Sequence, residues 1–230
     1  MDIRTRLDSA QALYDSGKYS EAIELLDIGR FDLNSEAAYN IGNCYTRMGE
    51  LGEARLFFER ALILNPNNED ARHNLDWVQL RLSDAIADPT QSLGQWFSIQ
   101  LRGFMSSEGW LLAAIMLLVL SVALLALRKW KFPMMNWRWP FTSTALALAF
   151  VGLAWWSTPK SNLCIATAPS TYGYSEPFGQ GKRILLLSEG SAAQLRKSSE
   201  GWFFLELGDG RLAWFDAAQW GHVLPPETTF

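Results

Sequence analysis

The sequence predicts a multidomain chain with an α-helical repeat region, a transmembrane helical hairpin and a small all-β barrel. Three observations predict this class: a motif that recurs after 32 residues, two long uncharged stretches, and short strand-like segments after Pro159. We therefore expect repeats with a capping helix at residues 1–85, a linker at 86–108, two membrane helices with a basic loop at 109–158, and the barrel at 160–230.

Two copies of one motif predict the helical repeats. At equal offsets, Ala10, Leu13, Gly17, Tyr19, Ala22 and Leu26 are followed by Gly42, Tyr45, Gly49, Leu51, Ala54 and Phe58. A small residue at 42 allows two antiparallel helices to cross closely, and a glycine at 49 permits the turn between them. Pro66 cannot continue a helix, so it ends the second one.

This motif resembles the tetratricopeptide repeat. The second unit, Ser35–Asn68, meets the family pattern at nearly every position. The first, Ile3–Asn34, is two residues shorter than the usual repeat and lacks the closing proline. We interpret Glu69–Ser83, which keeps the apolar spacing of a first helix alone, as a cap, because terminal repeats are usually atypical.

Two apolar stretches predict the membrane hairpin. Trp110–Leu127 has 18 residues without charge, close to the length that spans a bilayer core, and Phe141–Trp156 has 16. Tryptophans flank the second stretch, as at membrane interfaces. A buried helix of a soluble protein is the alternative for the first stretch. One span followed by an interfacial helix is the alternative for the pair.

The charges of the predicted loop indicate an orientation. Arg128, Lys129, Lys131 and Arg138 all lie there, and the positive-inside rule then puts the loop in the cytoplasm of a bacterium. Both folded segments would be periplasmic, at the inner membrane. Residues 1–25 hold no apolar core typical of a signal peptide. An upstream start, a removed signal and an inverted topology therefore stay open.

Short strands and turn residues predict the barrel. The expected strands are Leu163–Thr167, Arg183–Leu187, Ala193–Lys197, Trp202–Leu207 and Arg211–Phe215. Three short motifs are similar to those of a bacterial SH3 domain: Gly201–Trp202, Asp209–Gly210–Arg211 and Ala213–Trp214–Phe215. Ala213 departs from that pattern, in which glycine is commoner.

Charge and composition limit the function classes. Residues 1–108 carry 10 basic and 17 acidic residues, which argues against nucleic acid as a partner. The two cysteines are too few for a disulfide framework or a cysteine-based metal site. His73 and His222 lie in different predicted domains without catalytic partners nearby in sequence. We therefore expect no catalytic residue, metal or cofactor, and no enzyme; Cys44 is interpreted as an inert buried thiol.

The repeat groove is the candidate partner site. If the first helix of each pair lines the concave face, the exposed positions include Gln11 and Tyr14, and then the predicted contacts Tyr39, Asn43, Arg47, His73 and Trp77. Aromatic anchors of this kind dominate interfaces. Asn43 with Asn74 is similar to the asparagine pair of carboxylate-binding clamps, whose basic partners are missing here at most positions. Capture of a terminal carboxylate is therefore the narrower alternative.

The barrel offers a second set of possible ligand contacts, at Tyr172, Tyr174, Trp202 and Trp214. The two tyrosines are expected in the loop after the first strand. For the two tryptophans, a place in the core is the favoured interpretation. Exposed aromatic residues there could dock a proline-rich peptide or a cell-wall glycan.

The order of these parts resembles the BatE-type proteins of the bacterial aerotolerance (Bat) group. That resemblance implies a membrane-anchored scaffold with other membrane proteins as partners, namely proteins with von Willebrand factor A domains and an associated MoxR-type ATPase. The alternative is a cell-wall-associated protein whose SH3-like domain recognises peptidoglycan.

Overall fold

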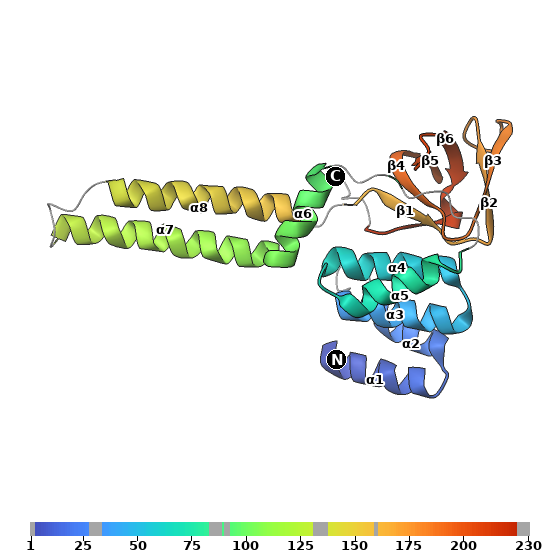
Figure 1. The fold of residues 1–230 in the computed structure, drawn as a ribbon, viewed down its shortest axis with the longest axis horizontal. Coiled ribbons are helices and arrows are strands. Elements are labelled where there is room, and N and C mark those ends of the chain that lie inside the picture. Colours follow the sequence, from blue (N-terminus) through green and yellow to red (C-terminus); the bar gives the residue numbers. More distant parts are fainter. Residues whose placement is uncertain are drawn as a thin grey trace. The chain divides into compact units, whose positions relative to one another are not determined.

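The chain forms two compact units in the computed structural model, which describes residues 3–27, 34–82, 89, 93–130, 138–158 and 161–224 (Figure 1). One unit comprises Met1–Thr90 and Lys160–Phe230, and the other comprises Gln91–Pro159. The predicted repeats and the predicted strands therefore belong to one compact unit, and the apolar stretches form a second unit inserted between its two segments.

Five helices build the N-terminal part of the first unit. They are α1 (Ile3–Asp15), α2 (Tyr19–Leu26), α3 (Ser35–Met48), α4 (Leu51–Leu64) and α5 (Glu69–Gln79). The pairs α1–α2 and α3–α4 occupy the two predicted repeat units, and α5 packs on α4 where the cap is expected. Asn34 and Asn68 cap α3 and α5, since each side chain accepts a hydrogen bond from the amide three residues on.

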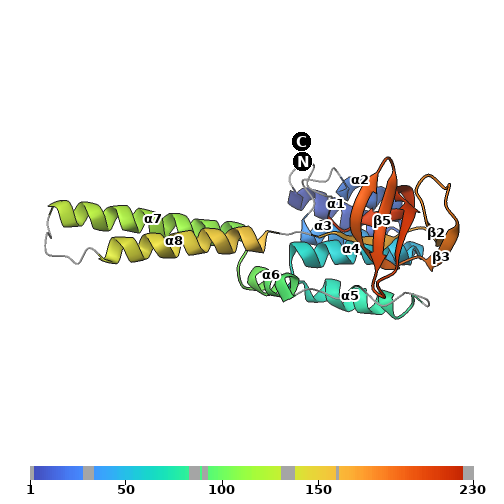
Figure 2. The ribbon, with the colours of Figure 1, turned by 90° about the horizontal axis from the view of Figure 1, so that it is seen from above.

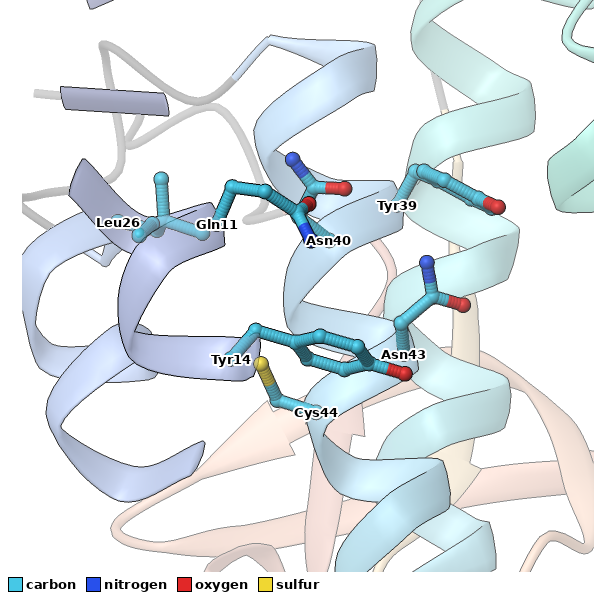
Figure 3. A pocket seen from close by; sticks show the side chains of 8 residues that line it. Gln11, Tyr14, Leu26, Tyr39, Asn40, Asn43 and Cys44 are labelled. Atoms are coloured by element: carbon cyan, nitrogen blue, oxygen red, sulfur yellow. The ribbon is translucent and has the colours of Figure 1, made fainter. Parts of the chain in front are cut away.

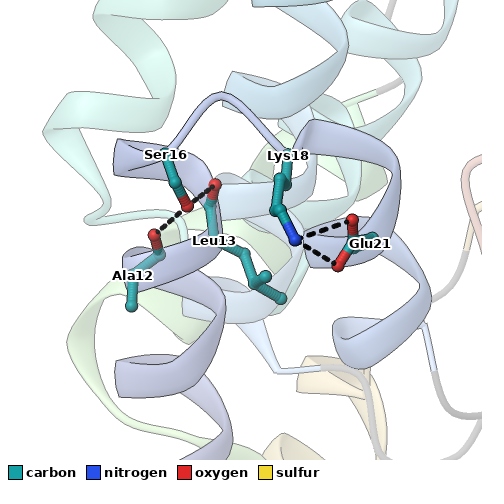
Figure 4. Close-up of polar contacts among 5 residues, drawn as sticks. All are labelled: Ala12, Leu13, Ser16, Lys18 and Glu21. Carbon is teal, nitrogen blue, oxygen red and sulfur yellow. Dashed lines mark hydrogen bonds and ion pairs between the residues drawn. The ribbon is translucent and has the colours of Figure 1, made fainter.

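A tight turn joins α1 to α2 (Figure 4). Ser16 Oγ donates to the carbonyl oxygens of Ala12 and Leu13 at 2.7 and 3.1 Å. These carbonyl oxygens of the last turn of α1 thereby gain a hydrogen-bond donor. Gly17 has a φ of +76°, in the left-handed region that favours glycine. Lys18 and Glu21 form an ion pair at 3.3 Å, but both are exposed, so it adds little stability.

Close packing between α3 and α4 confirms the role predicted for the small residue at 42. A Cβ added to Gly42 would lie 2.7 Å from Cε1 of Phe58, a ring that is fully buried. Gly49, with φ +83°, ends α3 in the left-handed conformation. The repeat core is continuous across both helical pairs, because buried alanines and aromatic rings from α1 to α5 pack in one cluster.

Seven strands form one antiparallel sheet in the C-terminal part. They are β1 (Leu163–Ala166), β2 (Ser170–Tyr174), β3 (Arg183–Ser188), β4 (Ala192–Ser199), β5 (Trp202–Leu207), β6 (Leu212–Asp216) and β7 (Trp220–His222). A 3-10 turn, η1 (Ala217–Gln219), precedes the last strand. The spatial order is β3-β2-β6-β5-β4-β1-β7.

Two features of this sheet correct the sequence prediction. The sheet is not closed into a barrel, because β3 and β7 stand at opposite ends of its order. Strands β2 and β7 were not predicted, so Tyr172 and Tyr174 lie on a strand and not in a loop. The five expected strands are confirmed within a residue or two at most of their ends.

Helix α4 packs directly on the sheet. Its contacts are with β1 and β7, and Ile165, Ala192 and Val223 are buried in the same cluster as the helical core. Arg55, 1% exposed, donates to the carbonyl oxygen of Gly190 at 2.6 Å, and Arg60 donates to the carbonyl oxygen of His222 at 2.8 Å. One buried and one half-buried arginine thus donate to backbone carbonyls of the sheet segment and tie the second repeat to it.

Glycines allow this close approach. A Cβ on Gly52 of α4 would lie 2.7 Å from the carbonyl oxygen of Ala166, and one on Gly221 of β7 would lie within the Leu56 side chain. The backbone amide of Gly52 also donates to Glu189 at 3.2 Å. The outer face of α4 is therefore occupied by the sheet, and the first helices of the pairs keep their opposite face for other contacts.

The second unit consists of three helices, α6 (Leu93–Phe104), α7 (Ser107–Trp130) and α8 (Arg138–Ser157). Helix α6 lies within the segment predicted as a linker. Helices α7 and α8 run side by side as an antiparallel hairpin in both views (Figures 1 and 2). Ser107–Leu127 and Arg138–Ser157 are long and apolar enough to cross a membrane.

Small residues line the hairpin contact. Ala114, Ala147 and Ala154 are buried there, and Ser121 Oγ donates to the carbonyl oxygen of Pro140 at 2.9 Å. Small side chains with interhelical hydrogen bonds are typical of membrane helix pairs. Only 17% and 22% of the two apolar windows are buried, whereas the core helix of a soluble protein is mostly buried.

Candidate partner-binding groove

The groove is built on the first helix of each pair. Helices α1 and α3 stand side by side, and a pocket of about 270 Å³ opens between them (Figure 3). It is lined by Ala10, Gln11, Tyr14, Leu26, Tyr39, Asn40, Asn43 and Cys44. Four of these, Gln11, Tyr14, Tyr39 and Asn43, come from the groove residues predicted from the sequence.

The chemistry of the lining is polar and uncharged. Gln11, Asn40 and Asn43 supply amides that both donate and accept, and Tyr14 and Tyr39 supply hydroxyls. Ala10 and Leu26 add apolar surface. Such a lining matches a peptide, whose backbone offers the same donors and acceptors and whose side chains can fill the apolar part.

Arg47 belongs to the wall of the groove but does not line the pocket. Its Nε donates to the hydroxyl of Tyr14 at 2.8 Å, and its guanidinium lies 5.8 Å from the centre of that ring. This contact joins α3 to α1 and holds one aromatic residue of the pocket in place. The hydrogen bond to Tyr14 raises the pKa of Arg47, which keeps a positive charge beside a neutral lining.

Asn43 and Asn74 meet as the predicted asparagine pair. Asn74 Nδ2 donates to Asn43 Oδ1 at 2.8 Å, so α5 contributes to holding the amide of Asn43. The two side chains bind one another in this arrangement. Asn43 thus presents an oriented amide to the pocket, as a peptide-binding position needs.

The two remaining predicted residues, His73 and Trp77, lie on α5 and do not line the pocket. Both are exposed, and the Arg81 guanidinium stacks 3.3 Å from the centre of the Trp77 ring. Trp77 is therefore part of a rigid cation–π pair one turn beyond Asn74. The structure therefore separates these two α5 residues from the pocket.

Four lining residues were not predicted as groove positions, namely Ala10, Leu26, Asn40 and Cys44. The sequence prediction took the helix face formed by positions 39, 43 and 47, which are spaced by four residues. Asn40 and Cys44 follow the same spacing one residue along and fall on the side of α3 that faces α1. Burial raises the pKa of the Cys44 thiol to about 11, which fits the inert thiol predicted for this position.

The predicted aromatic contacts of the sheet gather on the face opposite the sheet core. Tyr174 packs edge-on against Trp202 with ring centres 5.6 Å apart, and it pairs in register with Trp214. Trp214 in turn packs on Phe204 at 5.0 Å. Both tryptophans are half-buried and lie outside the buried cluster of Leu205, Phe215 and their neighbours.

Tyr172 extends this aromatic face toward the sheet edge. It is 39% exposed, pairs with Leu186 across to β3, and carries the Arg183 guanidinium 4.3 Å from its ring centre. Leu186 is 61% exposed and Ile184 is 49% exposed. Exposed apolar patches of this kind mark interaction surfaces.

Comparison with known proteins identifies one part of the chain. Residues 35–68 match the family model of the tetratricopeptide repeat, the same range that the sequence motif predicts. Searches of the curated proteins and of the solved structures return no match. The match covers the helical pair α3–α4, which carries Tyr39, Asn43 and Arg47.

Proposed function

We propose that this protein is a membrane-anchored scaffold that recruits a protein partner through the α1–α3 groove and has no catalytic role of its own. The observation that carries the proposal is the pocket of amides and hydroxyls beside a tetratricopeptide repeat. Tetratricopeptide repeats stack helical pairs into concave binding surfaces. Here the opposite side of the second repeat is covered by the sheet, which directs binding to the groove.

Anchoring follows from α7 and α8. Their apolar side chains are largely exposed in the hairpin, and water is a poor solvent for so much apolar surface. A hairpin anchor keeps the groove near the bilayer, so that a membrane-bound partner meets it at raised effective concentration. We place both ends of the hairpin in the periplasm, on the basis of the basic residues between the spans.

The order of repeats, spans and strands further supports a place in a Bat-type complex of the bacterial envelope. In that assignment the partners are membrane proteins with von Willebrand factor A domains, linked to a MoxR-type ATPase, and the sheet is an SH3-like module. The tight turns that join β4 to β5 and β5 to β6, with φ of +82° at Gly201 and +84° at Gly210, support this proposal.

Co-purification from solubilised native membranes tests the groove. The variant combines Gln11→Ala with Asn40→Ala, which removes two amides from the lining. The matched control combines Ser20→Ala with Glu24→Ala, two exposed residues of α2 outside the pocket. Truncated anchors cost about 2 kcal/mol, so the pocket variant should lose most of the partner. Equal recovery with both variants would reject the groove.

A second candidate function is recognition of peptidoglycan by the aromatic face of β2, β5 and β6. The observation that favours it is the cluster of aromatic side chains on this face, in which Tyr174 packs edge-on against Trp202 and pairs in register with Trp214. The full chain should then co-sediment with purified sacculi, and Trp214→Ala should release it, while the pocket variant stays bound. Sedimentation that is unchanged by Trp214→Ala would reject this candidate.

A further inference from the structure

Helix α6 exposes large apolar side chains that a soluble protein would normally bury. Leu93, Trp96, Phe97 and Phe104 are 87%, 55%, 45% and 77% exposed. With Gln100 they fall within one stripe of the helix, because residues spaced by four, three and four lie on the same face. The opposite face, with Ser98 and Arg102, is the half-buried one.

The position of α6 in its own unit is fixed by aromatic contacts. Phe104 stacks on Trp110 of α7 with ring centres 5.9 Å apart, and Phe97 packs edge-on against Trp156 of α8 at 6.2 Å. The indole nitrogen of Trp156 donates to the Gly94 carbonyl oxygen at 3.5 Å. Helix α6 therefore meets the hairpin where α7 begins and α8 ends (Figure 2).

The two tryptophans that contact α6 mark one depth along the helical hairpin. Tryptophan collects at the boundary between hydrocarbon and head groups. Trp110 and Trp156 stand at the same end of the two apolar helices, and both touch α6. A helix held at that level has a stripe of apolar side chains that stay largely exposed beside their contacts with the hairpin, and one basic residue, Arg102, on its half-buried face. This is the pattern of a helix that lies in a membrane interface.

We propose that α6 is an in-plane membrane helix whose exposed face, Leu93, Trp96, Phe97 and Phe104, inserts among the lipids at the boundary of the bilayer. This inference rests on the membrane anchoring proposed above and adds a lipid-binding surface to it.

Site-specific quenching in vesicles of phosphatidylethanolamine and phosphatidylglycerol tests the proposal. An environment-sensitive fluorophore is attached at Leu93→Cys or Phe104→Cys in the full chain. Native Cys44 and Cys164 are buried, so the label falls on the introduced thiol. Leu118→Cys, in the middle of α7, reports deep lipid, and Ser198→Cys, on an exposed strand position, reports water.

Labels at 93 and 104 should show blue-shifted emission, quenching by nitroxides near the lipid head groups, and loss of quenching by aqueous iodide. Replacement of Trp96 and Phe104 by Gln should restore iodide quenching of the label at 93, while Gln100→Ala should leave it unchanged. Lipid quenching at 118 with water-like behaviour at 93 and 104 would overturn the in-plane helix alone. Shielding of 93 and 104 from both quenchers would also overturn it, in favour of a protein contact. A water-exposed label at 118 would reject the anchor itself.

Discussion

At the scale of single residues, the packing depends on glycines at positions of close approach. Gly42, Gly52 and Gly221 each sit against a neighbour that leaves no room for a Cβ. The first was predicted from the repeat motif. The other two were not, because the backbone or side chain that each approaches belongs to a segment more than 100 residues away, and a local pattern carries no trace of it.

Gly42→Leu should unfold the repeat region. A Cβ at this position would already lie 2.7 Å from the buried Phe58 ring, and overpacking of a core costs about 1–3 kcal/mol. The expected result is a marked drop in the thermal unfolding midpoint measured by circular dichroism. Gly152→Leu in α8, where an added Cβ meets no atom within 4 Å, is the control that should leave that midpoint in place. An unchanged midpoint for Gly42→Leu would contradict the close crossing of α3 and α4.

Glu53 gives the unfolding free energy a predictable pH dependence. Burial raises the pKa of its carboxyl above the ordinary 4.5, an effect that the nearby Arg60 partly opposes. The folded chain then holds this proton more tightly than the unfolded chain, so this contribution to stability is present at low pH and is lost as pH rises through the folded pKa. Glu53→Gln should flatten this part of the pH profile, above the ordinary pKa of 4.5. An identical slope for wild type and Glu53→Gln would disprove the effect.

At the scale of elements, local periodicity predicts what is built from local contacts. The helical pairs were predicted because their motif repeats after 32 residues, and the two apolar helices because their stretches are long. Strand β2 was missed because Ser170–Tyr174 follows a proline and contains Gly173, which reads as a turn. In the sheet that glycine is required, because a Cβ there would lie 2.8 Å from the Phe215 ring.

Helix α6 and the pocket show the same limit. The apolar residues of α6 are separated by Gly, Ser and Gln, and the segment therefore resembles a linker until its exposed stripe is seen. For the groove, four pocket residues followed from the expected first-helix faces. Leu26 was missed because it comes from a second helix and reaches the pocket only through the tilt of the pair.

The contact between α4 and the sheet should make the repeats and strands unfold together. Gly52→Leu places a side chain against the backbone of Ala166 and Thr167, which no rotamer change can relieve. Wild type should show coincident unfolding of the repeats and of the sheet, each followed by the hydrogen exchange of its own backbone amides. In Gly52→Leu the two transitions should separate, with the sheet signal lost first. Coincident transitions in the variant would mean that this contact does not couple the two parts.

At the scale of the whole molecule, the proposed function needs both the membrane anchor and the groove. The orientation of the anchor can be measured with single cysteines. Met134 lies outside the described residues but within the connection between the two apolar helices, and Ser198 lies on the sheet. Cys164, which is fully buried and has its thiol pKa raised to about 12, cannot serve as a reporter. With the outer membrane opened, an impermeant reagent should label Ser198→Cys and not Met134→Cys. The reverse pattern would place both folded segments in the cytoplasm.

The most direct test of the central claim is photo-crosslinking from the pocket in native membranes. A photoreactive amino acid at Asn40 lies in the lining, and the same group at Glu24 lies on an exposed position of α2 outside it. Adducts are then isolated and identified by mass spectrometry. We expect position 40 to form an adduct with another membrane protein and position 24 to form none. Absence of any adduct at 40, or the same adducts at both positions, would contradict a partner bound in the α1–α3 groove.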